Sequence, residues 1–492
     1  MLVAILICAA PLAAYSVYHL LCILVSIFCS KRYTFKESAK LEARVAILYL
    51  TCDDFSQEAC QSILNQKNIS FHLFILDDSI SEEYQEAVSK WVRKQANSIT
   101  LVRRNNRKHY KGGNINNWLE KYAKPNEYHY TLILDADQVI EPEYTWQMVN
   151  EIQNTNLAFV QSSHSGRKDL REPFQKLLSL QVDTTWMYEV PARENLGIMP
   201  SLGHGVLFRT KDLQDAEGFP PVVSEDLGLT IRLALLGRFG KYLNYVTGFE
   251  SFPKSYRDYW KRRRRWITAD AEIIKKMLPL IWRSKLGVQE TLDFTFRETR
   301  LAVGSLYWLL LVLICIAESS SLLEGHYFSS PYILMFVVMI APVLTALLIK
   351  KTDYRTKLCY ILVMPFIGAA SSSINLPATI QGLNGHSAFT PTGSNNNGTG
   401  ERPYILIEVL SSVLFIYCGL CFHNHFLLSM GLALLCSPAL RRLNSKSGHC
   451  IIVAASCLFW LLILEQVASH IIGGSVPLTH FFCFLGITLT LS

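Results

Sequence analysis

Charged residues are distributed very unevenly along this chain of 492 residues. The first 30 residues contain no Lys, Arg, Asp or Glu, most of the charge lies between Lys31 and Arg300, and long uncharged runs follow to Ser492. Only 18% of the residues are charged, against about a quarter in a typical globular sequence. This pattern excludes a disordered chain, a small disulfide-stabilised domain and a simple cytosolic enzyme. It predicts a soluble region of about 270 residues, enough for its own core, between membrane segments.

The uncharged runs have the length of membrane spans. Residues 1–29 exceed the roughly 20 apolar residues that cross a bilayer, and they lack the basic start and cleavage site of a signal peptide. Lys31, Arg32 and Lys36 follow, so the positive-inside rule places the end of this helix in the cytoplasm. About six further spans are predicted, over 299–322, 331–350, 403–421, 424–440, 450–472 and 477–491.

The segment 358–383 crosses the membrane an even number of times if the charged loops are placed correctly. The basic loop at 350–357 precedes it, and the basic loop at 441–446 fixes the orientation of the spans that follow. We expect a helix at the membrane interface, interrupted at Pro365, with a short hairpin as the alternative. The net charge of +7 suits cytoplasmic loops beside anionic lipid headgroups.

The charged region alternates between strand and helix patterns. Short runs rich in β-forming residues alternate with amphipathic stretches, which indicates an α/β fold with a parallel, Rossmann-like sheet. The predicted strands are 45–50, 71–76, 131–137 and 158–163, and the predicted helices are 56–66, 81–97, 114–123 and 143–154. Ligands bind at the carboxyl ends of such strands. Acidic pairs stand at those ends, at 53–54, 77–78 and 135–137.

Two of the acidic motifs suggest chemistry. Asp135 and Asp137 lie two residues apart at a strand end and could hold a divalent cation against a diphosphate, although a solvated turn is the plain alternative. Glu225 and Asp226 open a helical pattern, and Asp226 could act as a general base or simply cap the helix.

Two basic motifs complete the set. In the run 261–266, Arg265 and Trp266 could pair with a diphosphate and stack on a sugar ring, whereas a basic membrane-facing surface is the alternative. Lys111 precedes two glycines that permit close backbone approach, so it could reach a phosphate or a base, with a flexible turn as the alternative.

In this order, the motifs resemble those of the membrane-integral family-2 glycosyltransferases, the group of cellulose, hyaluronan and chitin synthases. "LILDADQVI" is similar to their DxD strand, "SEDLGLTIRL" to their TED motif, and "YWKRRRRW" falls where QxxRW is expected. "LFILDDS", "KGGNIN" and "FVQSSH" resemble further motifs of cellulose synthases, and "AFTPTGSN" resembles their gating loop. The resemblance covers about residues 44–270 well.

The resemblance implies a GT-A-like domain and a role for each matching residue. Asp226 would be the catalytic base, and Asp135 and Asp137 would hold Mg²⁺ or Mn²⁺. Further residues would bind the UDP-sugar donor: Asp54, Asp77, Asp78, Lys111, Asp135, Arg262 and Arg265. The acceptor would contact His164, His204, Glu225 and Trp266, and Phe389 and Thr392 would lie in the gating loop.

Four departures from the family pattern bear on this interpretation. Arg262 replaces the Gln of QxxRW, and Pro391 replaces the Val of the gating motif. "SLGHGVLFR" stands where cellulose synthases have a Cys-containing turn, and the WGTR motif of hyaluronan and chitin synthases is missing from the sequence. The last two differences favour a glucan over an aminosugar polymer.

We therefore predict an inverting glycosyltransferase that polymerises a β-glucan from UDP-glucose and passes it through its own channel. The predicted parts are a membrane helix (1–30), a cytoplasmic GT-A domain (31–270), interface helices (271–298) and a channel region (299–492) that includes the interface helix 358–383 and the loop 384–402. The plasma membrane is the expected location, the bilayer and the growing glycan are the expected partners, and accessory export or regulatory subunits are left open.

Three alternatives remain at the level of the sequence. A non-processive enzyme that makes a glucosylceramide- or diacylglycerol-type glycolipid would use the same motifs. A small-solute transporter with a regulatory domain would be expected to show internal repeats and charged residues within spans, and apart from Glu465 these features are scarce here. A nucleic-acid-binding protein would be expected to interleave aromatic residues with its basic patch, and we predict no nucleic-acid partner.

Overall fold

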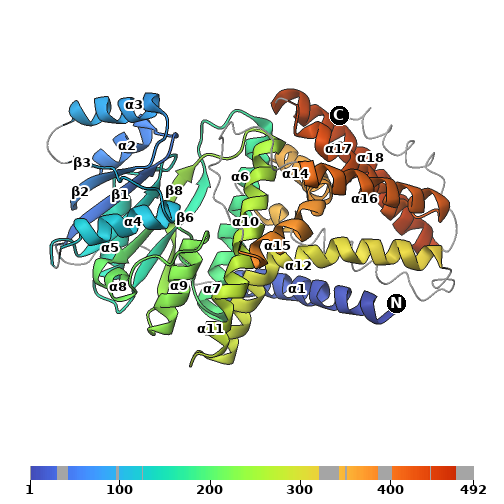
Figure 1. Cartoon of the computed structure of the whole chain (residues 1–492), viewed down its shortest axis with the longest axis horizontal. Coiled ribbons are helices and arrows are strands. Elements are labelled where there is room, and N and C mark those ends of the chain that lie inside the picture. The colour runs from blue at the N-terminus through green and yellow to red at the C-terminus, as the bar shows by residue number, and fades with distance from the viewer. Residues whose placement is uncertain are drawn as a thin grey trace.

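The computed structural model describes residues 2–29, 43–95, 99–124, 126–320, 343–349, 352–385, 402–443 and 445–472. A β-sheet with its covering helices lies on the left of Figure 1, and a group of long apolar helices lies on the right. Three helices, α6, α7 and α10, run between the two parts. The predicted α/β fold class, inserted between apolar helices, is confirmed.

The sheet has eight strands in the order β3-β2-β1-β4-β7-β6-β8-β5. The first half is parallel, as expected, and consists of β1 (Arg44–Thr51), β2 (Ser70–Asp77), β3 (Ile99–Val102) and β4 (Tyr130–Asp135). The second half consists of β5 (Val139–Ile140), β6 (Phe159–Gly166), β7 (Val206–Arg209) and β8 (Gly240–Glu250).

The sheet is mixed rather than wholly parallel, which differs from our prediction. Strand β7 lies antiparallel between β4 and β6, and β5 pairs antiparallel with the end of β8. The difference arises because β7 has only four residues and β5 only two, too few to show a strand pattern in the sequence. Because β7 runs the opposite way, the turn that precedes it opens at the carboxyl edge of its neighbours.

Both faces of the sheet are buried, which explains the continuous apolar run of β1. Ala46 and Leu48 pack into a cluster on one face, and Val45, Ile47 and Tyr49 pack into a separate cluster on the other. Successive side chains of a strand point to opposite faces, so a strand covered on both sides must be apolar at every position.

Helices connect the strands and join the sheet to the apolar helices. They are α2 (Gln57–Leu64), α3 (Glu82–Arg93), α4 (Tyr110–Lys121), α5 (Tyr144–Ile152), α6 (Pro173–Thr184), the π-helix η1 (Thr185–Glu189), α7 (Val190–Leu196), α8 (Thr210–Asp215), α9 (Glu225–Leu235), α10 (Tyr256–Lys276) and α11 (Leu278–Trp282).

The apolar helices are α1 (Leu2–Cys29), α12 (Val288–Ser319), α14 (Tyr354–Ala370), α15 (Asn375–Leu383), α16 (Arg402–Cys421), α17 (His425–Leu440) and α18 (Ser445–Ile472), with short 3-10 turns η2 (Thr345–Leu348) and η3 (Ser372–Ile374). Within the described residues, five helical segments are long and apolar enough to cross a membrane. The chain is therefore a membrane protein.

The helix over 354–383 is interrupted at η3 and not at Pro365, where we expected the break. A proline is tolerated inside apolar helices because neighbouring groups satisfy the freed carbonyls. Whether this segment crosses the membrane or lies at its interface stays a prediction, as do the domain bounds. The predicted spans 331–350, apart from 343–349, and 477–491 lie outside the described residues.

A buried ion pair joins the apolar helices to α10. Glu408 on α16 accepts two hydrogen bonds of 2.6 Å from Arg441, and the two side chains are 0% and 2% exposed. Ser437 also donates to Glu408, and its hydroxyl lies 2.9 Å from that of Tyr256 on α10. The guanidinium of Arg441 lies 4.7 Å from the ring centre of Trp260, also on α10.

We expect Glu408→Gln to destabilise the protein by about 3–5 kcal/mol, because it leaves the Arg441 guanidinium buried without a counter-charge. Thermal unfolding of the detergent-solubilised protein measures the effect. As a control, Asp215→Asn removes one partner of Arg238 in a partly exposed ion pair, where about 0–1 kcal/mol is expected. Equal losses in the two variants would contradict the structural role of the buried pair.

Candidate active site

Several acidic side chains predicted from the sequence lie at one edge of the sheet. The register pairs Thr51 of β1 with Asp77 of β2, and Leu50 of β1 with Asp135 of β4. Asp54, Asp78 and Asp135 therefore follow the carboxyl ends of three adjacent parallel strands, where α/β sheets bind ligands.

The acids after β1 and β2 are engaged by protein groups. Asp54 accepts from the hydroxyl of Thr51 at 2.9 Å. Asp77 is buried and accepts from Arg103 at 2.8 Å. Asp78 forms a two-point ion pair with Arg104, with contacts of 2.9 and 2.6 Å.

Arg104 also fixes the backbone just before Lys111. It donates to the carbonyls of Lys108 and Tyr110 at 2.8 and 2.7 Å. Since Arg104 is bound to Asp78, the end of β2 thus sets the position of the first turn of α4. Asp78 therefore already serves to place Lys111.

Lys111 links helix α4 directly to the end of strand β4. Its Nζ atom lies 2.5 Å from Oδ1 of Asp135. Burial alone would lower the pKa of Lys111, but the charges of Asp135 and Glu225 outweigh it and hold that pKa above its usual value. The same contact keeps the pKa of Asp135 below its usual value, although burial acts in the opposite direction.

Glu225 and Asp226 occupy the first turn of α9, beside α4. Ser224 stands at the N-cap position, so Asp226 is not the cap that the simpler interpretation required. A Cβ atom on Gly112 would lie 2.9 Å from Cβ of Glu225, and one on Gly203, whose φ is +84°, would lie 2.9 Å from Oδ2 of Asp226. Glycine is thus needed at both positions, because a side chain there would collide with Glu225 or Asp226.

The two acids are also coupled in charge. Burial raises the pKa of Glu225, and the neighbouring Asp226 raises it further. Burial likewise raises the pKa of Asp226, while Lys111 acts against the rise. Asp226 is thus a carboxylate with increased basicity, which suits proton abstraction.

Asp137 lies close to other acidic side chains. It accepts from the backbone N–H of Ser251 at 3.0 Å, and burial, together with Glu250 and Asp135, raises its pKa to about 7. A cation with a preference for oxygen ligands would relieve this repulsion, so Asp135 and Asp137 fit Mg²⁺ or Mn²⁺.

Helix α10 contributes the basic and aromatic residues of the predicted QxxRW-like motif. Burial lowers the pKa of Arg265, and the nearby charges of Glu225 and Asp135 act against this lowering. Burial also lowers the pKa of Arg262, and the nearby charge of Glu250 acts against this lowering. The guanidinium of Arg262 lies 4.8 Å from the ring centre of Trp266. Trp266 is 44% exposed, so its ring is accessible.

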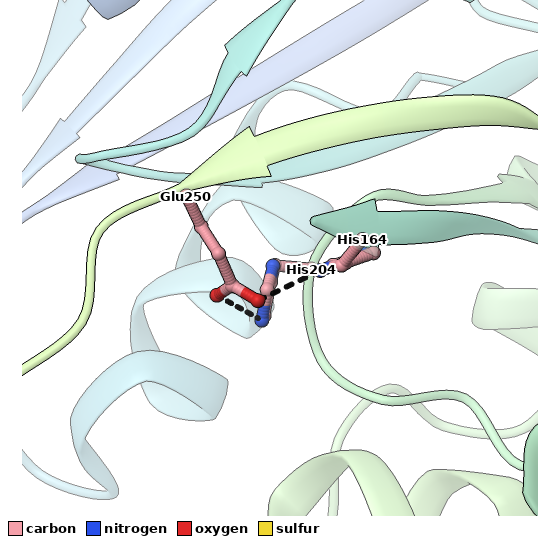
Figure 2. A group of neighbouring side chains, drawn as sticks. All are labelled: His164, His204 and Glu250. Atoms are coloured by element: carbon pink, nitrogen blue, oxygen red, sulfur yellow. Dashed lines mark ion pairs between the residues drawn. The ribbon is translucent and has the colours of Figure 1, made fainter. Parts of the chain in front are cut away.

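Two histidines and a glutamate form a compact cluster at the same edge (Figure 2). His164 lies on β6, His204 lies in the turn before β7, and Glu250 ends β8. Nδ1 of His164 is 3.6 Å from Oε1 of Glu250, and Nε2 of His204 is 3.8 Å from Oε2. Burial lowers the pKa of His204 to about 4.

Sequence reasoning missed Glu250. It ends β8, whose alternation of buried and exposed residues is irregular, so no strand was predicted there. Glu250 lies six positions before Tyr256, where α10 begins. This closeness to the basic motif of α10 is the one signal in the sequence that could have indicated Glu250 as a site residue. Phe389 and Thr392, the predicted gating residues, lie outside the described residues.

Comparison with known proteins gives consistent matches. Residues 130–350 match the family described as "Glycosyl transferase family group 2". The chain is 27% identical to the probable glucomannan 4-beta-mannosyltransferase 10 of Arabidopsis thaliana over 218 residues, which is 43% of this chain and 39% of that protein. It is 26% identical to glucomannan 4-beta-mannosyltransferase 1 of Oryza sativa subsp. japonica, again over 43% of this chain and 42% of that protein.

These curated relatives are matched over only about two fifths of their own length. Among solved structures, the mannosyltransferase PcManGT from Pyrobaculum calidifontis, in complex with GDP-Man and Mn²⁺, aligns with a TM-score of 0.49 and 16% identity over 76% of this chain and 99% of that one. A TM-score below 0.5 does not establish a shared fold, so the fold class rests on the sheet described above. The family match covers the DxD strand, α9 and α10. Residues 130–350 are therefore similar to the family-2 glycosyltransferases.

Proposed function

We propose that this protein is a membrane-bound, inverting glycosyltransferase that extends a β-linked glycan from a nucleoside diphosphate hexose. One observation carries the proposal: a candidate base, two acids suited to a cation, and three cationic side chains converge at one sheet edge from β4, α4, α9 and α10. The family-2 match of residues 130–350 supports it.

The donor would lie across the ends of β1, β2 and β4. Asp135 and Asp137 would hold Mg²⁺ or Mn²⁺, which supplies neutralisation of the diphosphate charge when it is bound. Lys111 and Arg265 both face Asp135 and would bind the diphosphate oxygens, with Arg262 nearby. Asp54, Asp77 and Asp78 would border the nucleoside, where Asp77 and Asp78 act through the arginines that they already hold.

In the proposed transfer step, one proton moves to the enzyme and the nucleoside diphosphate leaves the donor sugar. The acceptor hydroxyl oxygen attacks C1 of the donor sugar from the face opposite the diphosphate, and the C1–O bond breaks with its electron pair going to the diphosphate. Asp226 takes the hydroxyl proton, which its raised pKa favours. Arg265, beside Asp135, would stabilise the charge that develops on the leaving group.

Trp266 would form the platform for the acceptor sugar, because its ring is exposed and Arg262 covers one face. In this proposal, Glu225 and His204 would also contact the acceptor. His164 is only 1% exposed and stacks on Trp186 at 4.4 Å, so it is not accessible for the acceptor contact that the sequence suggested.

The identity of the sugar is left at the level of a hexose. We expected UDP-glucose and a β-glucan, but the relatives named above carry mannosyltransferase names, and they give UDP-glucose no support. Passage of the product through the membrane helices, gating by Thr392, accessory subunits and a plasma-membrane location also remain proposals.

A donor survey tests the proposed reaction. Purified full-length protein is incubated with labelled UDP-glucose or GDP-mannose and Mn²⁺ or Mg²⁺, and the product is sized and digested with linkage-specific glycanases. We expect a β-linked polymer from at least one donor. A glycolipid of one or two sugars would replace the polymerase proposal by the non-processive alternative. Failure of every donor to transfer its labelled sugar to a product would reject the proposed activity.

Asp226→Asn should lower the rate of transfer by about 10²-fold or more, because the amide cannot accept the proton. Donor binding, measured by titration with the nucleoside diphosphate, should stay within twofold of wild type. Asp212→Asn, in the same domain but on α8, is the matched control and should transfer normally. Polymerisation by Asp226→Asn at a near wild-type rate would show that another group is the base.

The pH dependence of kcat should show an acidic limb above the usual aspartate value of 3.8, because the active form of Asp226 is deprotonated and burial raises its pKa. Lys111→Gln removes a charge that holds this pKa down, so the limb should move to still higher pH. Lys121→Gln, at the exposed end of the same helix, should leave the limb in place. An unchanged limb in Lys111→Gln would contradict the proposed coupling.

A further inference from the structure

We infer that His164, His204 and Glu250 form a binding site for one divalent transition-metal ion of the zinc type, separate from the aspartate pair. The inference is independent of the proposed glycosyl transfer, because metal binding can be measured on the protein alone. It rests on the spacing of the donor atoms, on buried ring nitrogens without partners, and on the support around the rings.

The donor atoms have the spacing of a metal site. One nitrogen or oxygen from each of the three residues lies within 4.8 Å of the others, and the two contacts between a histidine and Glu250 measure 3.6 and 3.8 Å. Ligands that bind tetrahedral zinc at about 2.0–2.2 Å lie about 3.4 Å from one another. Both contacts are longer than a hydrogen bond and close to the spacing of zinc ligands.

Two ring nitrogens at the cluster are buried without a hydrogen-bond partner among the described residues. They are Nδ1 of His164, whose side chain is 0% exposed, and Nδ1 of His204. Buried polar atoms are nearly always satisfied in native proteins. A bound cation beside Nδ1 of His164 would remove this unsatisfied group, since that atom points at Glu250 (Figure 2).

The surrounding structure fixes both histidine positions. His164 stacks on Trp186 with an angle of 9° between the planes. Gln161 donates to the carbonyl of His204 at 2.9 Å and accepts from Leu202, which holds the turn before β7. Gly205, whose φ is +61°, leaves room for the ring, because a Cβ there would lie 2.5 Å from Nε2 of His164. These contacts hold the two rings in fixed positions beside Glu250.

The tautomer of His164 is compatible with metal binding through Nδ1. Binding through Nδ1 places the ring proton on Nε2, which lies 3.3 Å from the amide nitrogen of Gln161. That amide group also has the backbone carbonyls of Ser162, His204 and Gly205 as acceptors, so it does not depend on Nε2 of His164 as an acceptor.

The chemistry of the cluster selects a different ion from that of the aspartate pair. Two imidazoles and one carboxylate are the ligand set of open zinc sites, and imidazole favours zinc or cobalt over magnesium. Asp135 and Asp137 offer only oxygen, which favours Mg²⁺ or Mn²⁺. Asp137 lies near Glu250 and would add attraction for the ion, whereas the positive charge of Arg262, which also lies near Glu250, opposes it.

Metal titration of the full-length, tag-free protein in detergent tests the inference. After removal of metals with EDTA, Co²⁺ or Zn²⁺ is added, bound metal is counted by elemental analysis, and the visible absorption of Co²⁺ reports its coordination. We expect one tightly bound ion per chain with nitrogen ligation. The variants His204→Gln and Glu250→Gln should each weaken its affinity by about 10-fold or more.

Two controls separate this site from other histidines and from the aspartates. His425→Gln removes the histidine of another His–Glu pair, 2.9 Å from Glu465, and should leave the bound ion unchanged. Asp137→Asn should retain the ion. Loss of the ion in Asp137→Asn together with full retention in His204→Gln would move the site to the aspartates and overturn the inference.

Thermal unfolding provides a second readout that does not depend on the count. Zn²⁺ should raise the unfolding temperature of the wild-type protein, because an ion that binds only the folded state stabilises it. It should raise that of His204→Gln much less, with both proteins unfolding at similar temperatures in EDTA. Equal stabilisation of the two proteins by Zn²⁺, or no tight ion in wild type, would also overturn the inference.

Discussion

Mutual repulsion among partly buried carboxylates at the sheet edge is the constraint on which the arrangement of this domain depends. Asp135, Asp137, Glu225 and Asp226 lie close enough to raise one another's pKa or to share the same cationic neighbours. Lys111 offsets this repulsion, because its Nζ atom lies 2.5 Å from Oδ1 of Asp135. Buried charges persist only where opposite charges or ligands compensate them, so a site of this composition is stable only with its cations in place.

Helix α10 joins this charged edge to the membrane helices. One part of it directs Arg262 and Arg265 toward the acids, while Tyr256 and Trp260 contact the buried pair of Glu408 and Arg441. Further along, Lys275 donates to the carbonyl of Leu383 at the end of α15. The cationic side chains are thus held in register with the apolar helices, which gives a physical route by which the membrane part can influence the site.

The sequence predicted the parallel half of the fold well and the mixed half poorly. β1, β2 and β4 are long apolar runs buried on both faces, and each ends in acids that the structure brings to one edge. β5 and β7 are too short to show a pattern, and β8 is irregular. For this reason Glu250 was missed, and the two histidines could be assigned to an acceptor path but not to a cluster with a carboxylate.

Local patterns in the sequence determined the apolar helices, the parallel strands and the positions of the acids along the chain, because burial on one or both faces leaves a periodic signature in neighbouring residues. Only the tertiary structure decided that β7 lies between β4 and β6, that Gly112 packs against Glu225, and that Glu250 faces His164 and His204. Those contacts join residues 45 to 113 positions apart. Their energies depend on complementary shape and charge that no short window of sequence contains.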